Sequence, residues 1–185
     1  MARVRLFFSL PLPDEVKERL RPALDAARKA GGDGIGFTRH EQLHFTLAFL
    51  GEQPDAEAAL AAGEALREVP AFELALCGSG AFPNTARPRV LWLGVTAGAA
   101  DLMAAADRLR AALKERNFAL EERKFRPHLT LGRVRPRGER SAKRALAAIA
   151  PTELARWTAR EACLMQSMLA KGGATHTLLL TFPFR

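Results

Sequence analysis

The chain has 185 residues, of which 48% are hydrophobic, and it carries a formal net charge of +8. This apolar content is sufficient for the core of one compact domain, and no apolar run approaches the roughly 20 residues that a membrane-spanning helix requires. A basic surface attracts polyanions such as RNA, although it is equally common as a solvated face without any function.

The first half of the chain is expected to contain strands and helices in alternation. Residues 4–10 form the first strand, and the helix that follows, residues 14–30, carries apolar residues at the spacing of one helical face. Strands at residues 35–38 and 42–50 come next, and a second helix covers residues 55–68.

The second half repeats this order of elements and adds one strand at the end. Its expected strands and helices are, in chain order, strands 72–77 and 89–95, helix 101–116, strands 118–120 and 128–134, helix 138–149, and strands 154–168 and 175–184. The order strand-helix-strand-strand-helix-strand thus occurs twice. It predicts a duplicated α+β fold, in which two pseudo-symmetric lobes share one cleft within a single domain, residues 1–185.

Two copies of the sequence His-x-Thr-Leu lie at matching places in the two repeats. On a strand, residues i and i+2 point to the same face, so His44 and Thr46 share one face, and His128 and Thr130 do the same. The apolar residues that alternate with them, up to Phe49 in the first copy, are expected on the opposite, buried face. Each strand therefore presents a histidine and a threonine to the predicted cleft.

Two histidines and two threonines suit the hydrolysis of a phosphodiester without a metal ion. A neutral histidine can take a proton from water, while a protonated histidine can give a proton to the leaving oxygen. Histidine can do either because its ordinary pKa of about 6.5 allows both forms near neutral pH. The threonine hydroxyls can donate hydrogen bonds to the non-bridging phosphate oxygens. The residues alone leave open which histidine gives the proton.

A different motif overlaps the first copy. The segment His40-Glu41-Gln42-Leu43-His44 matches His-Glu-x-x-His, the zinc-protease signature, which requires both histidines on one face of a helix. The aromatic and β-branched residues that follow predict a strand here, and the second His-x-Thr-Leu would be left unexplained. A zinc hydrolase is therefore the less favoured alternative.

Four further residues are weaker candidates. Arg126 and Arg133 flank the second copy and could contact phosphate or nucleotide, or could belong to the basic surface. Phe82 lies in a turn that could place its ring against a base, or that could be a plain hairpin connection. His176, in the last expected strand, is predicted to be structural or exposed.

The chain has two cysteines, Cys77 and Cys163, each within an apolar stretch. Because there is no Cys-x-x-Cys pair, a thiolate zinc site is excluded. We expect two buried free thiols, as in a protein of a reducing compartment. The apolar run at the N-terminus is broken by Pro11 and Pro13, so we interpret it as a first strand and not as a signal peptide, and we expect a cytoplasmic location.

Several segments resemble the 2H phosphoesterases, and within them the RNA 2′,3′-cyclic phosphodiesterases of the 2′-5′ RNA ligase (LigT-like) family. Besides the two His-x-Thr-Leu copies, the resemblance extends over nearly the whole chain. The segments that carry it are residues 5–13, 43–51, 80–84, 87–95, 125–133, 165–167 and 172–173, and the final strand to Phe184.

The resemblance implies a two-lobed α+β fold with antiparallel sheets, flanking helices and a central cleft. It implies hydrolysis of an RNA 2′,3′-cyclic phosphate to a 2′-phosphate without a cofactor or metal. His44 would give a proton to the departing 3′-oxygen, His128 would accept one from water, and Thr46 and Thr130 would hold the phosphate.

The resemblance also implies a reversible 2′-5′ RNA ligation, which we expect to be a side activity. The partner would be RNA that ends in a 2′,3′-cyclic phosphate, with tRNA fragments among the candidates. We expect a monomer that does not associate with membranes. Composition alone also allows a protein that binds RNA ends without turning them over.

Overall fold

The computed structural model describes residues 3–170 and 173–185 of the chain. Its strands are β1 (Val4–Pro11), β2 (Ile35–Phe37), β3 (His44–Gln53), β4 (Phe72–Phe82), β5 (Val90–Val95), β6 (His128–Val134), β7 (Glu153–Ala159), β8 (Glu161–Ala170) and β9 (Gly173–Pro183). Its α-helices are α1 (Asp14–Gly31), α2 (Glu57–Gly63), α3 (Ala99–Glu115) and α4 (Glu139–Ala147). Short 3-10 helices are η1 (Gly32–Gly34), η2 (His40–Gln42) and η3 (Glu64–Glu68).

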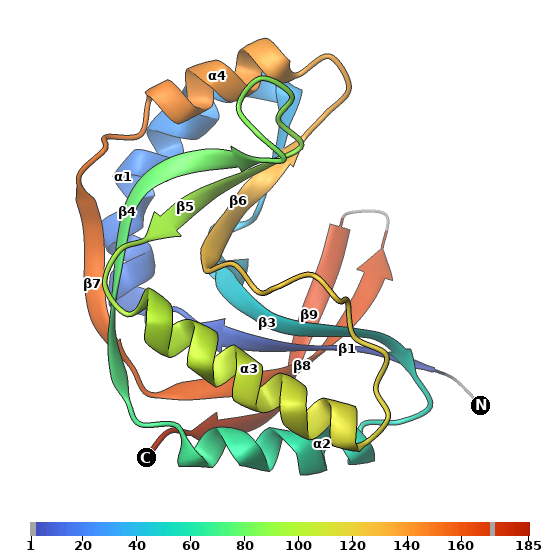
Figure 1. Cartoon of the computed structure of the whole chain (residues 1–185). Coiled ribbons are helices and arrows are strands. Elements are labelled where there is room, and N and C mark those ends of the chain that lie inside the picture. Colours follow the sequence, from blue (N-terminus) through green and yellow to red (C-terminus); the bar gives the residue numbers. More distant parts are fainter. Residues whose placement is uncertain (1–2, 171–172) are drawn as a thin grey trace.

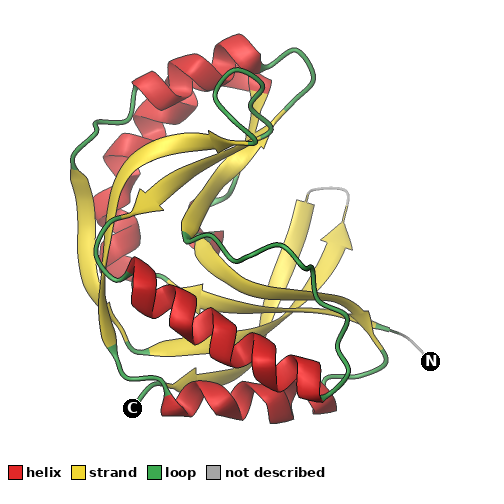
Figure 2. Ribbon diagram, viewed as in Figure 1, coloured by secondary structure: helices red, strands yellow, loops and turns green. Residues whose placement is uncertain are grey.

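The described strands form two antiparallel sheets. One has four strands in the order β3-β1-β8-β9, and the other has five in the order β2-β6-β5-β4-β7. Figures 1 and 2 show the sheets as two lobes of a C-shaped molecule, with the helices on the outer side. The predicted α+β fold with antiparallel sheets and flanking helices is therefore confirmed.

Each lobe is built from both halves of the chain. The four-stranded sheet joins β1 and β3 to β8 and β9, while the five-stranded sheet takes β2 from the first half and its other four strands from the second. The helices also cross over: α1 follows β1 but packs against β7 and α4, and α3 follows β5 but packs against β3 and α2. Each of the two complete sheets therefore contains strands from both halves of the sequence.

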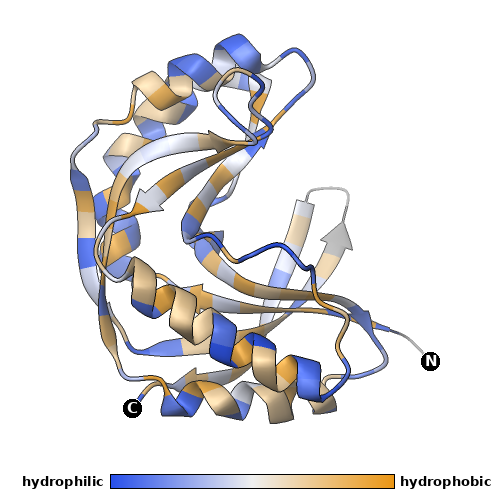
Figure 3. Ribbon diagram, in the orientation of Figure 1, coloured by the Kyte–Doolittle hydropathy of each residue, from blue (hydrophilic) through white to orange (hydrophobic). Residues whose placement is uncertain are grey.

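The helices bury the apolar faces that the sequence predicts. In α1 the buried residues include Val16, Leu20 and Leu24, and in α3 they include Leu102 and Leu109. Figure 3 shows hydrophobic and hydrophilic positions in alternation along both helices. None of the helices in the described parts is long and apolar enough to cross a membrane.

Several predicted elements differ from the structure. The expected strand 72–77 continues to Phe82, which is the last residue of β4 and not part of a turn. The expected strand 154–168 is divided at Arg160 into β7 and β8, which belong to different sheets, because the chain passes there from one lobe to the other. Residues 118–120 form no strand: the N–H of Phe118 bonds to the carbonyl of Leu113 and closes the end of α3. The expected helix 55–68 is shorter, since its second half is the 3-10 helix η3.

Candidate active site

The two His-x-Thr-Leu segments begin two strands that meet between the lobes. His44 is the first residue of β3 and His128 is the first residue of β6. These strands lie in different sheets and pack against each other on the inner side of the C-shaped molecule (Figure 1). The topology therefore brings the two predicted histidines, which are far apart in sequence, to the same region.

Both imidazoles are held by the same local hydrogen bond. The Nδ1 atom of His44 lies 2.7 Å from the carbonyl oxygen of Gln42, and Nδ1 of His128 lies 2.6 Å from that of Arg126. A carbonyl only accepts, so Nδ1–H donates in both rings. This bond fixes the ring orientation and leaves Nε2 as the nitrogen that can gain or lose a proton at the site.

The threonines keep the predicted alternation with the histidines. The Oγ1 atom of Thr46 lies 3.2 Å from Nε2 of His44, so this pair is in direct contact. Thr130, two residues after His128 on β6, is partly buried, while Leu129 between them is fully buried. Each strand thus turns a histidine and a threonine to one face and its apolar residues to the other.

Both strands carry a β-bulge directly after the threonine. The pairing between β1 and β3 skips Leu47, and the pairing between β5 and β6 skips Leu131. Each extra residue and the one after it, Ala48 and Gly132, are buried. A bulge bends a strand and changes the aim of nearby side chains. The repeat of this irregularity at matching positions indicates that the two strands have the same local geometry.

The bulge also corrects the prediction for Phe49. The sequence alternation places this ring on the buried face, but Phe49 is 45% exposed. Because Leu47 is an extra residue, the alternation is reset, and Phe49 falls on the side of His44 and Thr46. Its ring is covered in part by the guanidinium of Arg5, which lies 4.8 Å from the ring centroid.

His44 lies in an aromatic pocket of the four-stranded lobe. Its ring centroid is 5.1 Å from that of Phe7 and 5.7 Å from that of His176. These rings border a pocket of about 460 Å³, whose rim includes Lys17 and Glu41. Burial lowers the pKa of His44 below its ordinary value; the hydrogen bond to the backbone opposes this, and the charge of a protonated His176 adds to it.

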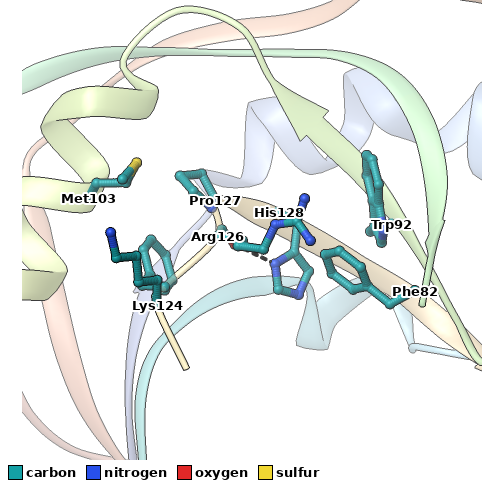
Figure 4. A pocket seen from close by; sticks show the side chains of 8 residues that line it. Phe82, Trp92, Met103, Lys124, Arg126, Pro127 and His128 are labelled. Atoms are coloured by element: carbon teal, nitrogen blue, oxygen red, sulfur yellow. Dashed lines mark hydrogen bonds between the residues drawn. The ribbon is translucent and has the colours of Figure 1, made fainter. Parts of the chain in front are cut away.

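His128 lies in a second pocket, in the five-stranded lobe. This pocket has a volume of about 540 Å³, and its walls include Phe82, Trp92, Lys124 and Arg126. The ring of Phe82 meets that of His128 edge to face at 4.9 Å, and the Arg126 guanidinium lies 5.3 Å from the Phe82 centroid (Figure 4). Burial lowers the pKa of His128, the backbone hydrogen bond raises it, and the charge of Arg126 lowers it further.

The structure places two of the three candidate nucleotide contacts beside His128 and the third outside the pockets. Phe82 and Arg126 both line the pocket of His128. Arg133 lies five residues further along β6, is exposed, and lines neither of the two pockets. The structure therefore brings two of these three candidate nucleotide contacts together with His128.

The His-Glu-x-x-His segment does not form the helix that a zinc protease needs. Residues 40–42 make a single 3-10 turn, and His44 begins a strand. His40 turns toward α1, where its Nε2 atom lies 3.7 Å from a carboxylate oxygen of Glu18. Within the described residues, no group of three or more His, Cys, Asp and Glu side chains could hold a metal ion. The match to the zinc-protease motif is therefore accidental, because the segment does not have the helical geometry that the motif requires.

The sequence analysis did not identify His176 as a neighbour of the site. Its ring contacts both Phe7, at a centroid distance of 4.9 Å, and His44. This contact depends on the pairing of β9 with β8 and of β8 with β1. No local sequence pattern shows that pairing, so the position of His176 in the sequence does not indicate that it lies near His44.

The family model and the related sequences that match this chain indicate the same family. Residues 12–168 match the 2′-5′ RNA ligase superfamily. A protein of Archaeoglobus fulgidus named RNA 2′,3′-cyclic phosphodiesterase is 36% identical over 134 residues, which are 71% of this chain and 73% of the relative.

Solved structures agree with the sequence relatives. A crystal structure of a Thermus thermophilus protein superposes with a TM-score of 0.78 at 31% identity, covering 97% of both chains. The structure of Escherichia coli LigT in complex with 3′-AMP gives a TM-score of 0.77 at 28% identity, covering 98% of both chains.

Proposed function

Because this chain belongs to the 2′-5′ RNA ligase superfamily, we propose that it is an RNA 2′,3′-cyclic phosphodiesterase that opens the cyclic phosphate to a 2′-phosphate. One observation carries the proposal: two histidines from different sheets have the same backbone hydrogen bond at Nδ1, and each has Nε2 available beside a pocket. Relatives of this chain carry the name of the proposed activity.

The proposed reaction needs one proton acceptor and one proton donor. Nε2 of His128 takes a proton from water while the water oxygen attacks phosphorus. The bond between phosphorus and O3′ breaks, and Nε2–H of His44 gives its proton to O3′. The phosphorus keeps its bond to O2′, so the product is a 2′-phosphate. Thr46 and Thr130 donate hydrogen bonds to the non-bridging oxygens, where negative charge increases in the transition state.

The neighbours of the two rings support this direction of proton transfer. His128 lies beside Arg126, whose guanidinium is always charged and which therefore favours the neutral, proton-accepting form. The ionisable neighbour of His44 is His176, whose own pKa is lowered by burial, so it is largely neutral near neutral pH. His44 thus lacks the permanent cation that lies beside His128, while burial, the largest cause, lowers the pKa of both rings.

The reaction as proposed requires neither a metal ion nor a cofactor, because the two imidazoles supply both proton transfers. The substrate would be RNA with a 2′,3′-cyclic phosphate end, including tRNA fragments. Phe82 can stack on a base, and Arg126 and Arg133 can contact phosphate or nucleotide. The nucleotide complex of LigT supports a nucleotide site in this fold.

We extend the proposal to four further properties. The chain would act as one domain, since each of its two sheets contains strands from both halves of the sequence. It would act as a monomer, since both histidines come from the same chain. A cytoplasmic location is supported by two cysteines that form no disulfide. The reverse reaction, in which a 5′-hydroxyl replaces water, would give 2′-5′ ligation as a side activity.

Product analysis tests this function. The purified chain is incubated with an oligoribonucleotide that ends in a 2′,3′-cyclic phosphate, with and without EDTA, and the product is identified by phosphorus NMR. We expect a 2′-phosphate at equal rates under both conditions. A 3′-phosphate product, or activity that EDTA abolishes and zinc restores, would contradict the proposal.

A further inference from the structure

Strand β6 leads from the candidate site into a run of exposed arginines. Beyond Thr130, the chain continues through Arg133, Arg135 and Arg137, and all three side chains are exposed. Among the described residues, no hydrogen-bond or ion-pair partner exists for any of these three guanidinium groups. The one carboxylate in this segment, Glu139, lies in the first turn of α4. The segment therefore carries three positive charges that no carboxylate of the described residues pairs with.

The first two arginines lie on the same face as the catalytic residues. The bulge at Leu131 resets the alternation, so Arg133 falls on the side of His128 and Thr130. The N–H of Arg135 bonds to the carbonyl of Gly34 at 2.9 Å, which continues the pairing of β6 beyond its end. Alternate residues of a strand are about 7 Å apart, close to the spacing of successive phosphates in an extended RNA strand.

The third arginine lies on a turn with a fixed shape. Arg137 has φ of 64°, in the left-handed region that residues other than glycine rarely adopt. The N–H of Gly138 bonds to the carbonyl of Arg135 at 2.9 Å, and a Cβ atom at Gly138 would come within 2.4 Å of the Gly34 carbonyl oxygen. The turn is therefore pinned to η1, and Figure 3 shows hydrophilic residues along this loop between β6 and α4.

We propose that Arg133, Arg135 and Arg137 form a track for the sugar–phosphate backbone of single-stranded RNA. This inference rests on the proposed function, because the track begins on the strand of His128 and leads outward from it. Its ligand is the part of the RNA that precedes the cyclic end, and the charge of the arginines complements the phosphates. The track gives the enzyme a preference for oligonucleotides over cyclic mononucleotides.

The chain provides a matched control for this proposal. Arg89 is also exposed, and its carbonyl accepts a hydrogen bond from the N–H of Val134 at 2.9 Å. Val90, the next residue, is the register partner of Arg133. Because successive residues of a strand alternate, Arg89 points to the face opposite Arg133. Its replacement removes one guanidinium charge, half of what the double variant below removes, without removing a contact on the track.

The test compares the double variant Arg135→Ala/Arg137→Ala with Arg89→Ala on two substrates. One is 2′,3′-cyclic AMP, and the other is a hexaribonucleotide with a 2′,3′-cyclic phosphate end. We expect the double variant to raise KM for the hexamer about tenfold and to reduce the slope of log KM against log salt by about 1.4, or about 0.7 per lost phosphate contact. The hydrolysis of 2′,3′-cyclic AMP should be unchanged, which also shows that the variant is folded.

Two results would overturn the track. One is an equal KM of the unmodified chain for both substrates, and the other is a double variant that behaves like Arg89→Ala on the hexamer. If the unmodified chain hydrolyses neither substrate, the proposed function itself fails. The failure of the track is thus distinguished from the failure of the activity.

Discussion

The ring of His176 meets the ring of His44 edge to face, with centroids 5.7 Å apart. His128 has a different neighbour, Phe82, in the same edge-to-face arrangement at 4.9 Å. The two histidines therefore share their backbone hydrogen bonds but not their surroundings. One imidazole is packed against a second ionisable ring and the other against a phenyl ring with a nearby guanidinium.

The contact between the two imidazoles predicts a positioning role for His176. His176→Phe keeps a ring against His44, whereas His176→Ala removes it and lets the His44 ring shift. We expect kcat to fall about tenfold in the alanine variant and to stay within about threefold in the phenylalanine variant, because small displacements of a proton donor are costly. Steady-state kinetics on a 2′,3′-cyclic nucleotide measure this difference.

The same pair of variants has a readout in the pH profile. His176 carries charge only when protonated, and that charge lowers the pKa of His44. Both variants should therefore shift the basic limb of kcat/KM to higher pH. An alanine variant with unchanged kcat and an unchanged profile would show that His176 has no influence on His44.

The pH dependence of activity follows from the lowered pKa values of the two histidines that are proposed to act in catalysis. The proposed active form has His44 protonated and His128 neutral. As pH rises through the lowered pKa of His44, the donor is lost, and as pH falls through that of His128, the acceptor is lost. We expect a bell-shaped profile of kcat/KM with its maximum below about pH 6.5, the ordinary pKa of histidine. A maximum above neutral pH would contradict this assignment.

The threonine hydroxyls should contribute to catalysis more than to stability. Thr46→Val and Thr130→Val keep the shape of the side chain but remove the donor to the non-bridging oxygens. We expect each to lower kcat roughly a hundredfold, by analogy with the loss of one oxyanion-hole donor. Thermal denaturation is the control, and both variants should melt within a few degrees of the unmodified protein. An unchanged kcat in both variants would exclude the proposed phosphate contacts.

The bulge of β6 should be intolerant of a side chain at Gly132. A Cβ atom there would lie 2.7 Å from the Gly36 carbonyl oxygen and 2.9 Å from Cα of Phe37, both on the backbone of β2. We expect Gly132→Ala to lower the free energy of unfolding by about 1–3 kcal/mol, the usual cost of overpacking. The equivalent bulge residue of β3, Ala48, has a Cβ atom because β3 is an edge strand without such a neighbour.

Gly36→Ala is the matched control for this prediction. Its Cβ atom would have an ordinary contact of 3.7 Å with the Arg133 carbonyl oxygen. Urea denaturation of both variants measures the difference in the free energy of unfolding. Equal stabilities of the two variants would show that β2 moves away easily.

The sequence predicted what depends on local periodicity. The apolar stripes of α1 and α3 and the alternation at His44 and Thr46 were all confirmed, because each follows from a repeat of 3.6 or 2 residues within one element. The two histidines could be paired as candidates because the same four-residue motif occurs twice. Their catalytic roles stay a prediction.

The features that sequence could not provide depend on neighbouring strands. The bulge at Leu47, and with it the exposure of Phe49, is a property of the register between β1 and β3. The division at Arg160 reflects which sheet each strand joins, which the hydrophobic pattern of residues 154–168 does not encode. The neighbourhood of His176 has the same origin, since β1 and β8 lie between its strand, β9, and the strand of His44.

The central claim is that His44 and His128 act together in one proton-transfer site. The most direct measurement is kcat/KM, on an oligoribonucleotide with a 2′,3′-cyclic phosphate end, for His44→Ala, His128→Ala and the double variant. We expect each single change to lower kcat/KM by about a thousandfold or more, and the double variant to be scarcely worse than either, because residues that act as a unit are not additive. A single variant that stays within tenfold of the unmodified enzyme, or losses that multiply in the double variant, would contradict this account.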